Sequence, residues 1–82
     1  MRLDKYLKVS RLIKRRTVAS EACAAGRVMA NGKPAKASYD VKVGDRLEIR
    51  FGERVLRVKV VSLQEHAGKA EAPAMYQEET EG

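Results

Sequence analysis

Residues 2–32 read RLDKYLKVSRLIKRRTVASEACAAGRVMANG, and this stretch predicts two short helices followed by the turn that opens a sheet. Its first half repeats apolar and small residues at spacings of three and four, the pattern of one helix face: Leu3, Tyr6, Leu7 and Ser10. A second stripe of small residues, Ala19, Ala22 and Cys23, predicts a helix from residue 16 or 17 to residue 25. Small side chains there would let the two helices pack closely, with Gly26 ending the second one.

A small antiparallel sheet is expected to follow the helices. Asn31-Gly32 is a hairpin signal, because both central positions of that turn favour a positive φ. It joins predicted short strands at residues 27–30 and 33–35, and Pro34 marks the second as an edge. Residues 46–51 and 55–61 alternate apolar and polar side chains, which places two sets on the core side: Leu47, Ile49 and Phe51, and Leu56, Val58 and Val60. The sequence therefore predicts an α+β fold, a helix pair followed by a small antiparallel sheet.

The chain of 82 residues is expected to hold one domain at residues 1–63 and a tail at residues 64–82. The apolar pattern lapses after residue 63, and the tail carries five glutamates against the single cation Lys69. Its apolar island, Ala74-Met75-Tyr76, is short. The tail is therefore predicted to be acidic and mobile.

Positive charge is concentrated at the start of the chain. Residues 2–16 carry seven lysines and arginines against one anion, Asp4, and the whole chain has a formal net charge of +6. A basic patch on one face is the electrostatic footprint of a polyanionic partner, and the alternative is a solvated helix face. Asp4 suits the positive end of the first helix, and it could equally hold Arg2 or Arg16 by a charge-assisted hydrogen bond.

Several classes of function find no support in the sequence. No nucleophile lies beside a base, no phosphate-binding loop is present, and His66 has no partners at metal-ligand spacing, so no enzyme, catalytic residue or metal site is predicted. The one cysteine, Cys23, fits a small core residue in a reducing compartment. No run is long enough to span a bilayer and no secretory signal is evident, so a cytoplasmic protein is expected.

Five motifs in a fixed order carry a resemblance to a known family: RLDKxL at residues 2–7, SR at 10–11, RTxA at 16–19, GRVxxNG at 26–32 and VGD at 43–45. They resemble the RNA-binding domain first described in ribosomal protein S4, over roughly residues 1–63. That domain also occurs in pseudouridine synthases, tyrosyl-tRNA synthetases and heat-shock protein 15. The resemblance implies the same helix pair and small sheet, and it implies that the ligand is RNA.

A longer run, RLDKYLKVSRLIKRRT at residues 2–17, resembles the small stand-alone members of this family that act in ribosome-associated quality control, the protein P family. The segments KAS at 36–38 and RFG at 50–52 support it. The resemblance implies binding to a large ribosomal subunit that carries an obstructed peptidyl-tRNA. It also implies contacts with 23S rRNA and P-site tRNA that support a partner factor adding an alanine tail. We expect a monomer on the ribosome, without cofactor.

By this resemblance, the residues expected to face RNA are Arg2, Asp4, Arg11 and Arg16. The other basic residues of the region are expected to join them: Lys5, Lys8, Lys14, Arg15, Arg27, Lys33 and Lys36. Arg15 departs from the family pattern, because many such domains place a Ser or Thr helix cap there. The chain has few aromatic residues, which favours recognition of RNA shape and phosphate, with Tyr39 as the candidate for base stacking.

Three alternatives stay open. The first is a recycling factor for stalled large subunits like heat-shock protein 15, although the chain lacks the long basic C-terminal extension of that protein. The second is a protein-interaction module that docks through Ala74-Met75-Tyr76 and the acidic end. The third is an adaptor for acidic membranes, which would need exposed apolar side chains beside the cations, whereas Leu3 and Leu7 are expected in the core.

Overall fold

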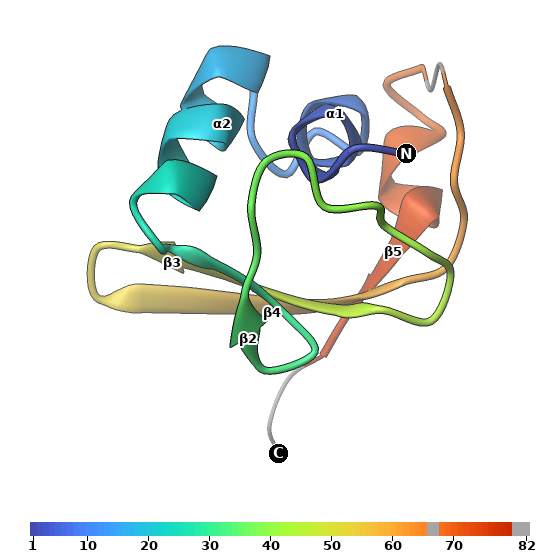
Figure 1. Ribbon diagram of the computed structural model, residues 1–82. Coiled ribbons are helices and arrows are strands. Elements are labelled where there is room, and N and C mark those ends of the chain that lie inside the picture. Colours follow the sequence, from blue (N-terminus) through green and yellow to red (C-terminus); the bar gives the residue numbers. More distant parts are fainter. Residues whose placement is uncertain (66–67, 80–82) are drawn as a thin grey trace.

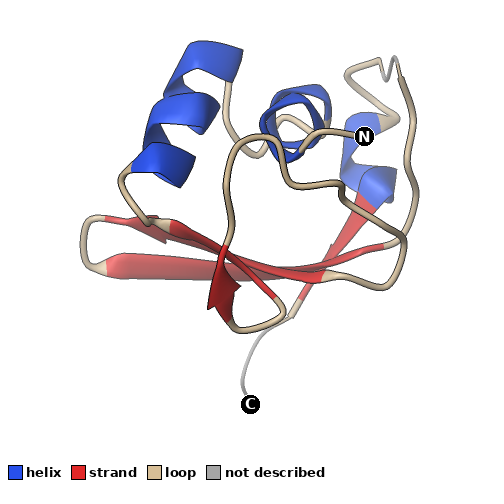
Figure 2. Ribbon diagram, viewed as in Figure 1, coloured by secondary structure: helices blue, strands red, loops and turns tan. Residues whose placement is uncertain are grey.

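The computed structural model describes residues 1–65 and 68–79 of the chain. The helical elements and strands follow one another as α1 (Leu3–Val9), α2 (Arg16–Ala24), β1 (Val28–Ala30), β2 (Lys33–Pro34), β3 (Arg46–Phe51), β4 (Arg54–Val60), the 3₁₀ helix η1 (Ala72–Met75) and β5 (Tyr76–Glu78). Figure 1 shows α1 and α2 side by side above one face of the sheet, and Figure 2 shows the other face uncovered by any helix. The predicted helix pair and antiparallel sheet are confirmed.

The sheet has five strands in the order β2-β1-β3-β4-β5, with every neighbouring pair antiparallel. The Asn31-Gly32 turn forms as predicted, and both residues have positive φ, 53° and 83°. Pro34 lies in β2, an edge strand, where its missing N–H leaves no ladder position unfilled. Asn31 also ties the turn to β3, because its side-chain oxygen accepts the N–H of Arg46 at 3.0 Å.

The core lies between the helix pair and the sheet. Helix α1 buries Leu3, Tyr6 and Leu7 completely, as its periodicity predicted. The sheet contributes its alternate residues, which are also fully or almost fully buried: Val28, Leu47, Ile49, Val58 and Val60. Phe51 was expected to join this set, but 44% of it is exposed. It ends β3, where the β3–β4 hairpin extends past α2 at the left of Figure 1 and no helix covers it.

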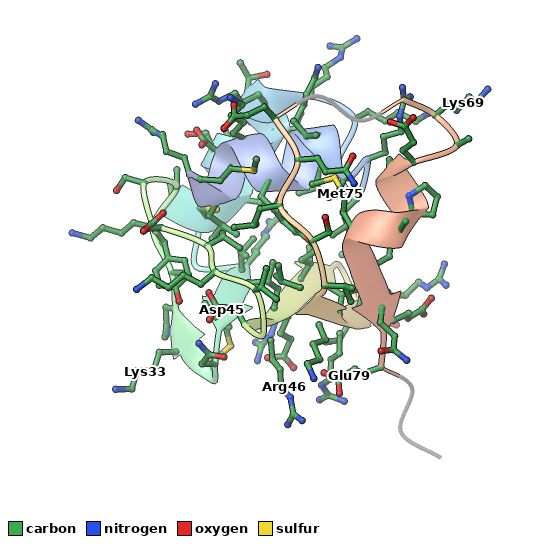
Figure 3. All side chains as sticks on the ribbon, turned by 90° about the vertical axis from the view of Figure 1, so that its right-hand side faces the viewer. Lys33, Asp45, Arg46, Lys69, Met75 and Glu79 are labelled. Carbon is green, nitrogen blue, oxygen red and sulfur yellow. The ribbon has the colours of Figure 1, made fainter. Side chains whose placement is uncertain are left out.

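The predicted boundary at residue 63 is wrong for the segment that forms η1 and β5. Ala72 and Met75 are completely buried, and β5 pairs with β4 along three residues. The buried hydroxyl of Tyr6 donates to the Met75 carbonyl at 2.7 Å, and Figure 3 shows Met75 between η1 and α1. The acidic composition of the tail had predicted a mobile segment, so the packing of this short apolar stretch was missed. The end of the predicted mobile tail, residues 80–82, and residues 66–67 lie outside the described residues.

No helix in the described part of the chain is long and apolar enough to cross a membrane.

Candidate functional site

Asp4 is the centre of a charged cluster that joins the start of α1 to the start of α2. The residue is only 4% exposed. Arg2 approaches one carboxylate oxygen with Nε at 3.2 Å and the other with a terminal nitrogen at 3.4 Å. Arg16, the first residue of α2, approaches from the other helix, with Nε at 3.4 Å and a terminal nitrogen at 3.5 Å. Asp4 thus holds both arginines, the two partners that the sequence offered as alternatives.

The cluster keeps Asp4 ionised although it is buried. Burial of the carboxyl favours its neutral form, but the hydrogen bonds from Arg16 and Arg2 and from the Lys5 N–H together outweigh it. The pKa of Asp4 is therefore lower than its ordinary value. A permanent negative charge at this point allows two guanidinium groups from different elements to lie close to each other.

Both arginines keep donors for a ligand. The side chains of Arg2 and Arg16 are 55% and 48% exposed. A guanidinium has five N–H donors in a planar fork, and each arginine turns only Nε and one terminal nitrogen toward Asp4. The remaining donors can make charge-assisted hydrogen bonds to phosphate oxygens. Asp4 itself is buried, so its role is to position the arginines rather than to meet a polyanion.

The last turn of α1 and the link between α1 and α2 present further cations to solvent. Lys8, Arg11, Lys14 and Arg15 are exposed, and within residues 1–65 and 68–79 none of them forms an ion pair. The link is ordered by backbone hydrogen bonds from Arg11 N to the Lys8 carbonyl and from Ile13 N to the Leu7 carbonyl, both 3.1 Å long. Arg11 adopts a positive φ of 63°, which is costly for a residue with a side chain.

Helix α2 begins among these cations. Arg15 occupies its N-cap position and makes no side-chain capping hydrogen bond. The first N–H groups of the nine-residue helix are thus left without a side-chain acceptor, as the departure at Arg15 predicted. Their partial positive charge adds to that of Arg15 and Arg16. This side of the molecule can therefore bind a chain of phosphates through arginine forks, lysine point charges and backbone donors.

The other predicted site residues are placed differently. Lys5 forms an ion pair with Glu65, a partner that its sequence neighbours did not indicate. Lys36 begins the loop that contacts the start of α1, where the carbonyls of Ala37 and Tyr39 accept the N–H groups of Asp4 and Leu3. Arg27 follows α2 at its far end from Arg16. Lys33 lies in β2, and Figure 3 shows it at the opposite end of the molecule from the helix pair.

The surroundings of Tyr39 and Cys23 indicate structural roles for both residues. The Tyr39 hydroxyl donates to Asp45 at 2.9 Å, and the residue packs against the core, which leaves it poorly placed for base stacking. The hydrogen bond to Asp45 and burial raise the pKa of Tyr39. Cys23 is buried in the core, and this burial raises the pKa of its thiol, which makes it unreactive. No group of metal-ligand side chains occurs among the described residues, and His66 lies outside them.

Comparison with known proteins gives consistent results. The S4 domain family model matches residues 1–47. A protein of Streptococcus pneumoniae named RQC P-site tRNA stabilizing factor is 56% identical over 94% of this chain and 88% of its own length. Its namesake in Bacillus subtilis is 57% identical over 93% of this chain and 88% of its own length. The Heat shock protein 15 homolog of Haemophilus influenzae is 37% identical over 95% of this chain and 60% of its own length.

Two solved structures give the same picture of the fold. The trimeric structure of Vibrio cholerae Heat Shock Protein 15 matches with a TM-score of 0.89 and 31% sequence identity, over 96% of this chain and 81% of that chain. A solution structure of a hypothetical protein matches with a TM-score of 0.84 and 28% identity, over the full length of both chains.

Proposed function

Because the chain belongs to the S4 domain family and, within it, to the RQC P-site tRNA stabilizing factors, we propose that it stabilises the tRNA in the P site of a stalled large ribosomal subunit. The subunit in question carries an obstructed peptidyl-tRNA. The chain acts there by binding rather than by catalysis, as a monomer in the cytoplasm, and it needs no cofactor.

The proposed contacts are with the backbones of 23S rRNA and of the P-site tRNA. By holding the tRNA in place, the chain supports a partner factor that adds alanine to the stalled polypeptide. The observation that carries this proposal is the Asp4 cluster, in which one buried carboxylate orients two half-exposed arginines beside the cationic link. Side chains already held in position lose less conformational entropy on binding, so more of the free energy of each contact contributes to affinity.

The residues proposed to contact phosphate belong to both ends of α1, to the link and the start of α2, and to the loop that contacts the start of α1. We name them the helix-side surface: Arg2, Lys8, Arg11, Lys14, Arg15, Arg16 and Lys36. Lys5 is proposed as a peripheral contact, because its pair with Glu65 partly neutralises it. Arg27 is left out of this surface, because it follows α2 at the end far from Arg16.

A reconstituted reaction tests the function. It contains large subunits with an obstructed peptidyl-tRNA, alanyl-tRNA and the tailing factor, and the readouts are co-sedimentation of the chain and incorporation of alanine. We expect the chain to bind these subunits more tightly than subunits without tRNA and to raise alanine incorporation. Equal binding to both kinds of subunit would contradict stabilisation of the tRNA.

A recycling role like that of Heat shock protein 15 is the second candidate, because the fold of the Vibrio cholerae protein matches over almost the whole chain. The same reaction separates the two roles. Binding to the subunits with release of their peptidyl-tRNA, and without a gain in alanine incorporation, would favour recycling.

A further inference from the structure

The face of the sheet turned away from the helices carries a second group of cations. Leu47 and Ile49 point into the core, so side-chain alternation along β3 places Arg46, Glu48 and Arg50 on the outer face. In the same way, buried Val58 and Val60 place Arg57 and Lys59 there. Figure 3 shows the labelled Arg46 projecting from the sheet on the side opposite the helices, and Lys33 at the same end of the molecule.

Two of these cations face each other across the strands. The register of β3 and β4 pairs Arg46 directly with Lys59. Side chains directly opposite in an antiparallel pair have Cβ atoms about 4.5–5.5 Å apart, and like charges there are destabilising. The folded chain thus places two like charges opposite each other on its uncovered sheet face, where β3 begins and β4 ends. A bound anion between the two side chains would turn this repulsion into attraction.

The acidic residues of the outer face neutralise only part of its charge. Glu48 accepts a hydrogen bond from Arg57 Nε at 3.1 Å. Glu79 reaches Arg46 at 3.5 Å, while 70% of the Arg46 side chain stays exposed. Lys59 and Arg50 form no ion pair with any residue in the described ranges.

We propose that Arg46, Arg50 and Lys59, the outer basic face, contact the phosphates of a second RNA segment, so that one chain bridges two segments. The proposal rests on the proposed function, which gives the chain two RNA partners but assigns phosphate contacts only to the helix-side surface. Arg46 and Arg50 are four residues apart in β3, about 13 Å along the strand, so the face suits an extended run of phosphates rather than one small anion. Glu48, which accepts a hydrogen bond from Arg57, lies between them in β3.

The dimensions of the molecule define the geometry of the bridge. The molecule measures 32 × 28 × 20 Å, and the sheet separates the two basic surfaces. Two RNA segments bound on opposite faces would therefore be held one molecular width apart. Glu79 competes with the second segment for Arg46, which makes the acidic end of the described chain a modulator of this face.

Bridging of two tRNA molecules tests the proposal. Beads that carry immobilised tRNA are incubated with the full chain and with fluorescent tRNA, and the retained fluorescence is measured. Light scattering on the same sample measures whether the chain is a monomer, as we expect. This matters because a monomer with a single RNA surface cannot join two tRNAs. We expect the wild-type chain to retain fluorescent tRNA above the level without protein.

Three variants with equal reduction of charge locate the surfaces. Arg50→Gln/Lys59→Gln alters the outer basic face, Arg11→Gln/Lys14→Gln alters the helix-side surface, and Lys42→Gln/Arg54→Gln is the control. We expect the first two to bind single tRNAs about tenfold more weakly and to abolish bridging, while the control behaves like the wild type. The salt dependence of log Kd should fall by about 0.7–0.9 for each phosphate that a variant no longer binds. Glu79→Gln should strengthen bridging, because it frees Arg46.

The outcomes separate this inference from the proposed function. If the outer-face variant bridges tRNA as well as the wild type, or if bridging requires a dimer, the outer basic face is not an RNA surface and the proposed function still stands. If the wild-type chain joins no two tRNAs, this inference is wrong, whereas the proposed function is contradicted only by equal binding to subunits with and without tRNA. Melting curves of all variants check that these exposed substitutions leave the fold intact.

Discussion

The single carboxylate of Asp4 accepts hydrogen bonds from three groups, the Arg2 and Arg16 guanidinium groups and the Lys5 N–H. Each of its oxygens accepts from more than one donor, so Asp4 keeps other partners when one arginine is removed. The arginines, in contrast, are half exposed and contact Asp4 with only part of their donors. Loss of an arginine should therefore affect a ligand more than it affects the fold, whereas loss of Asp4 should affect both.

Arg16→Ala is expected to weaken association with large subunits about tenfold or more, because a charge-assisted contact contributes roughly 1.5–3 kcal/mol. The melting temperature should hardly move, since an exposed ion pair contributes only about 0–1 kcal/mol. Arg16→Lys should restore part of the binding, because an ammonium group keeps the charge and loses the fork. Co-sedimentation and melting curves measure the two effects.

Arg54→Ala is the matched control for this experiment, since it removes one exposed arginine from the β3–β4 hairpin. Its binding should equal that of the wild type. A large fall in the melting temperature of Arg16→Ala, with unchanged binding per folded molecule, would instead make Arg16 a structural residue.

Asp4→Asn should change how stability depends on pH. The pKa of Asp4 is lowered in the folded protein, so its contribution to stability is fully present above the unfolded value of 3.8 and is lost as the pH falls through the folded pKa. The Asn variant lacks this contribution at neutral pH and should lose less stability in acid than the wild type. Urea unfolding at pH values on both sides of 3.8 measures it.

Glu53→Gln, in the exposed β3–β4 turn, serves as the control and should follow the wild type. Parallel acid profiles for Asp4→Asn and the wild type would show that the pairing with the arginines does not stabilise the fold.

At the scale of elements, η1 and β5 complete the core rather than extending from it. Met75 fills the space beside α1, and its carbonyl oxygen accepts the Tyr6 hydroxyl and the N–H groups of Val61 and Ser62. The sheet gains its fifth strand from the same segment. Removing residues 64–82 is therefore expected to destabilise the domain, which reverses the expectation from composition alone.

Met75→Ala is expected to lower the free energy of unfolding by about 2–5 kcal/mol, because the side chain is completely buried. Tyr6→Phe should cost about 0.5–1.5 kcal/mol, the contribution of one buried hydrogen bond. Chemical denaturation measures both. Gln77→Ala, on the exposed side of β5, is the control, and equal stability of Met75→Ala and this control would show that η1 does not anchor the fold.

At the scale of the whole molecule, charge is arranged on two opposite sides of one thin sheet. Binding to large subunits or tRNA is expected to fall steeply with salt, by about a thousandfold between 50 and 200 mM if about six phosphates are contacted. Fluorescence titration at several salt concentrations measures the slope. A flat response would mean that phosphate contacts do not dominate, and it would favour the protein-interaction alternative.

Local periodicity was enough to predict most of the fold. Leu3, Tyr6 and Leu7 repeat at helical spacing and are buried, and the alternation around Leu47 and Val58 gave the correct core face. The prediction that Phe51 is buried was wrong, because alternation assigns a residue to a face of the sheet without showing where the covering helices end. Met75 was missed because its main partner, Tyr6, is 69 residues away in the chain and the island is short and followed by glutamates.

The part of the candidate site whose residues lie close together in the sequence was predictable. Asp4 was expected to hold Arg2 or Arg16, and it holds both; the resemblance to the family identified the two arginines as residues that face RNA. The outer basic face was not grouped in advance, because the pairing of Arg46 with Lys59 depends on the register between strands, which the sequence does not state. The pairing of Lys5 with Glu65 was missed for the same reason, since it joins α1 to a distant segment.

The structure of a large subunit recovered with this chain and an obstructed peptidyl-tRNA is the measurement that tests the central claim most directly. We expect Arg2 and Arg16 to remain held by Asp4, with their free donors at hydrogen-bond distance from backbone phosphates of 23S rRNA or of the P-site tRNA. A particle in which these arginines face solvent, while the chain is bound through another surface, would contradict the claim.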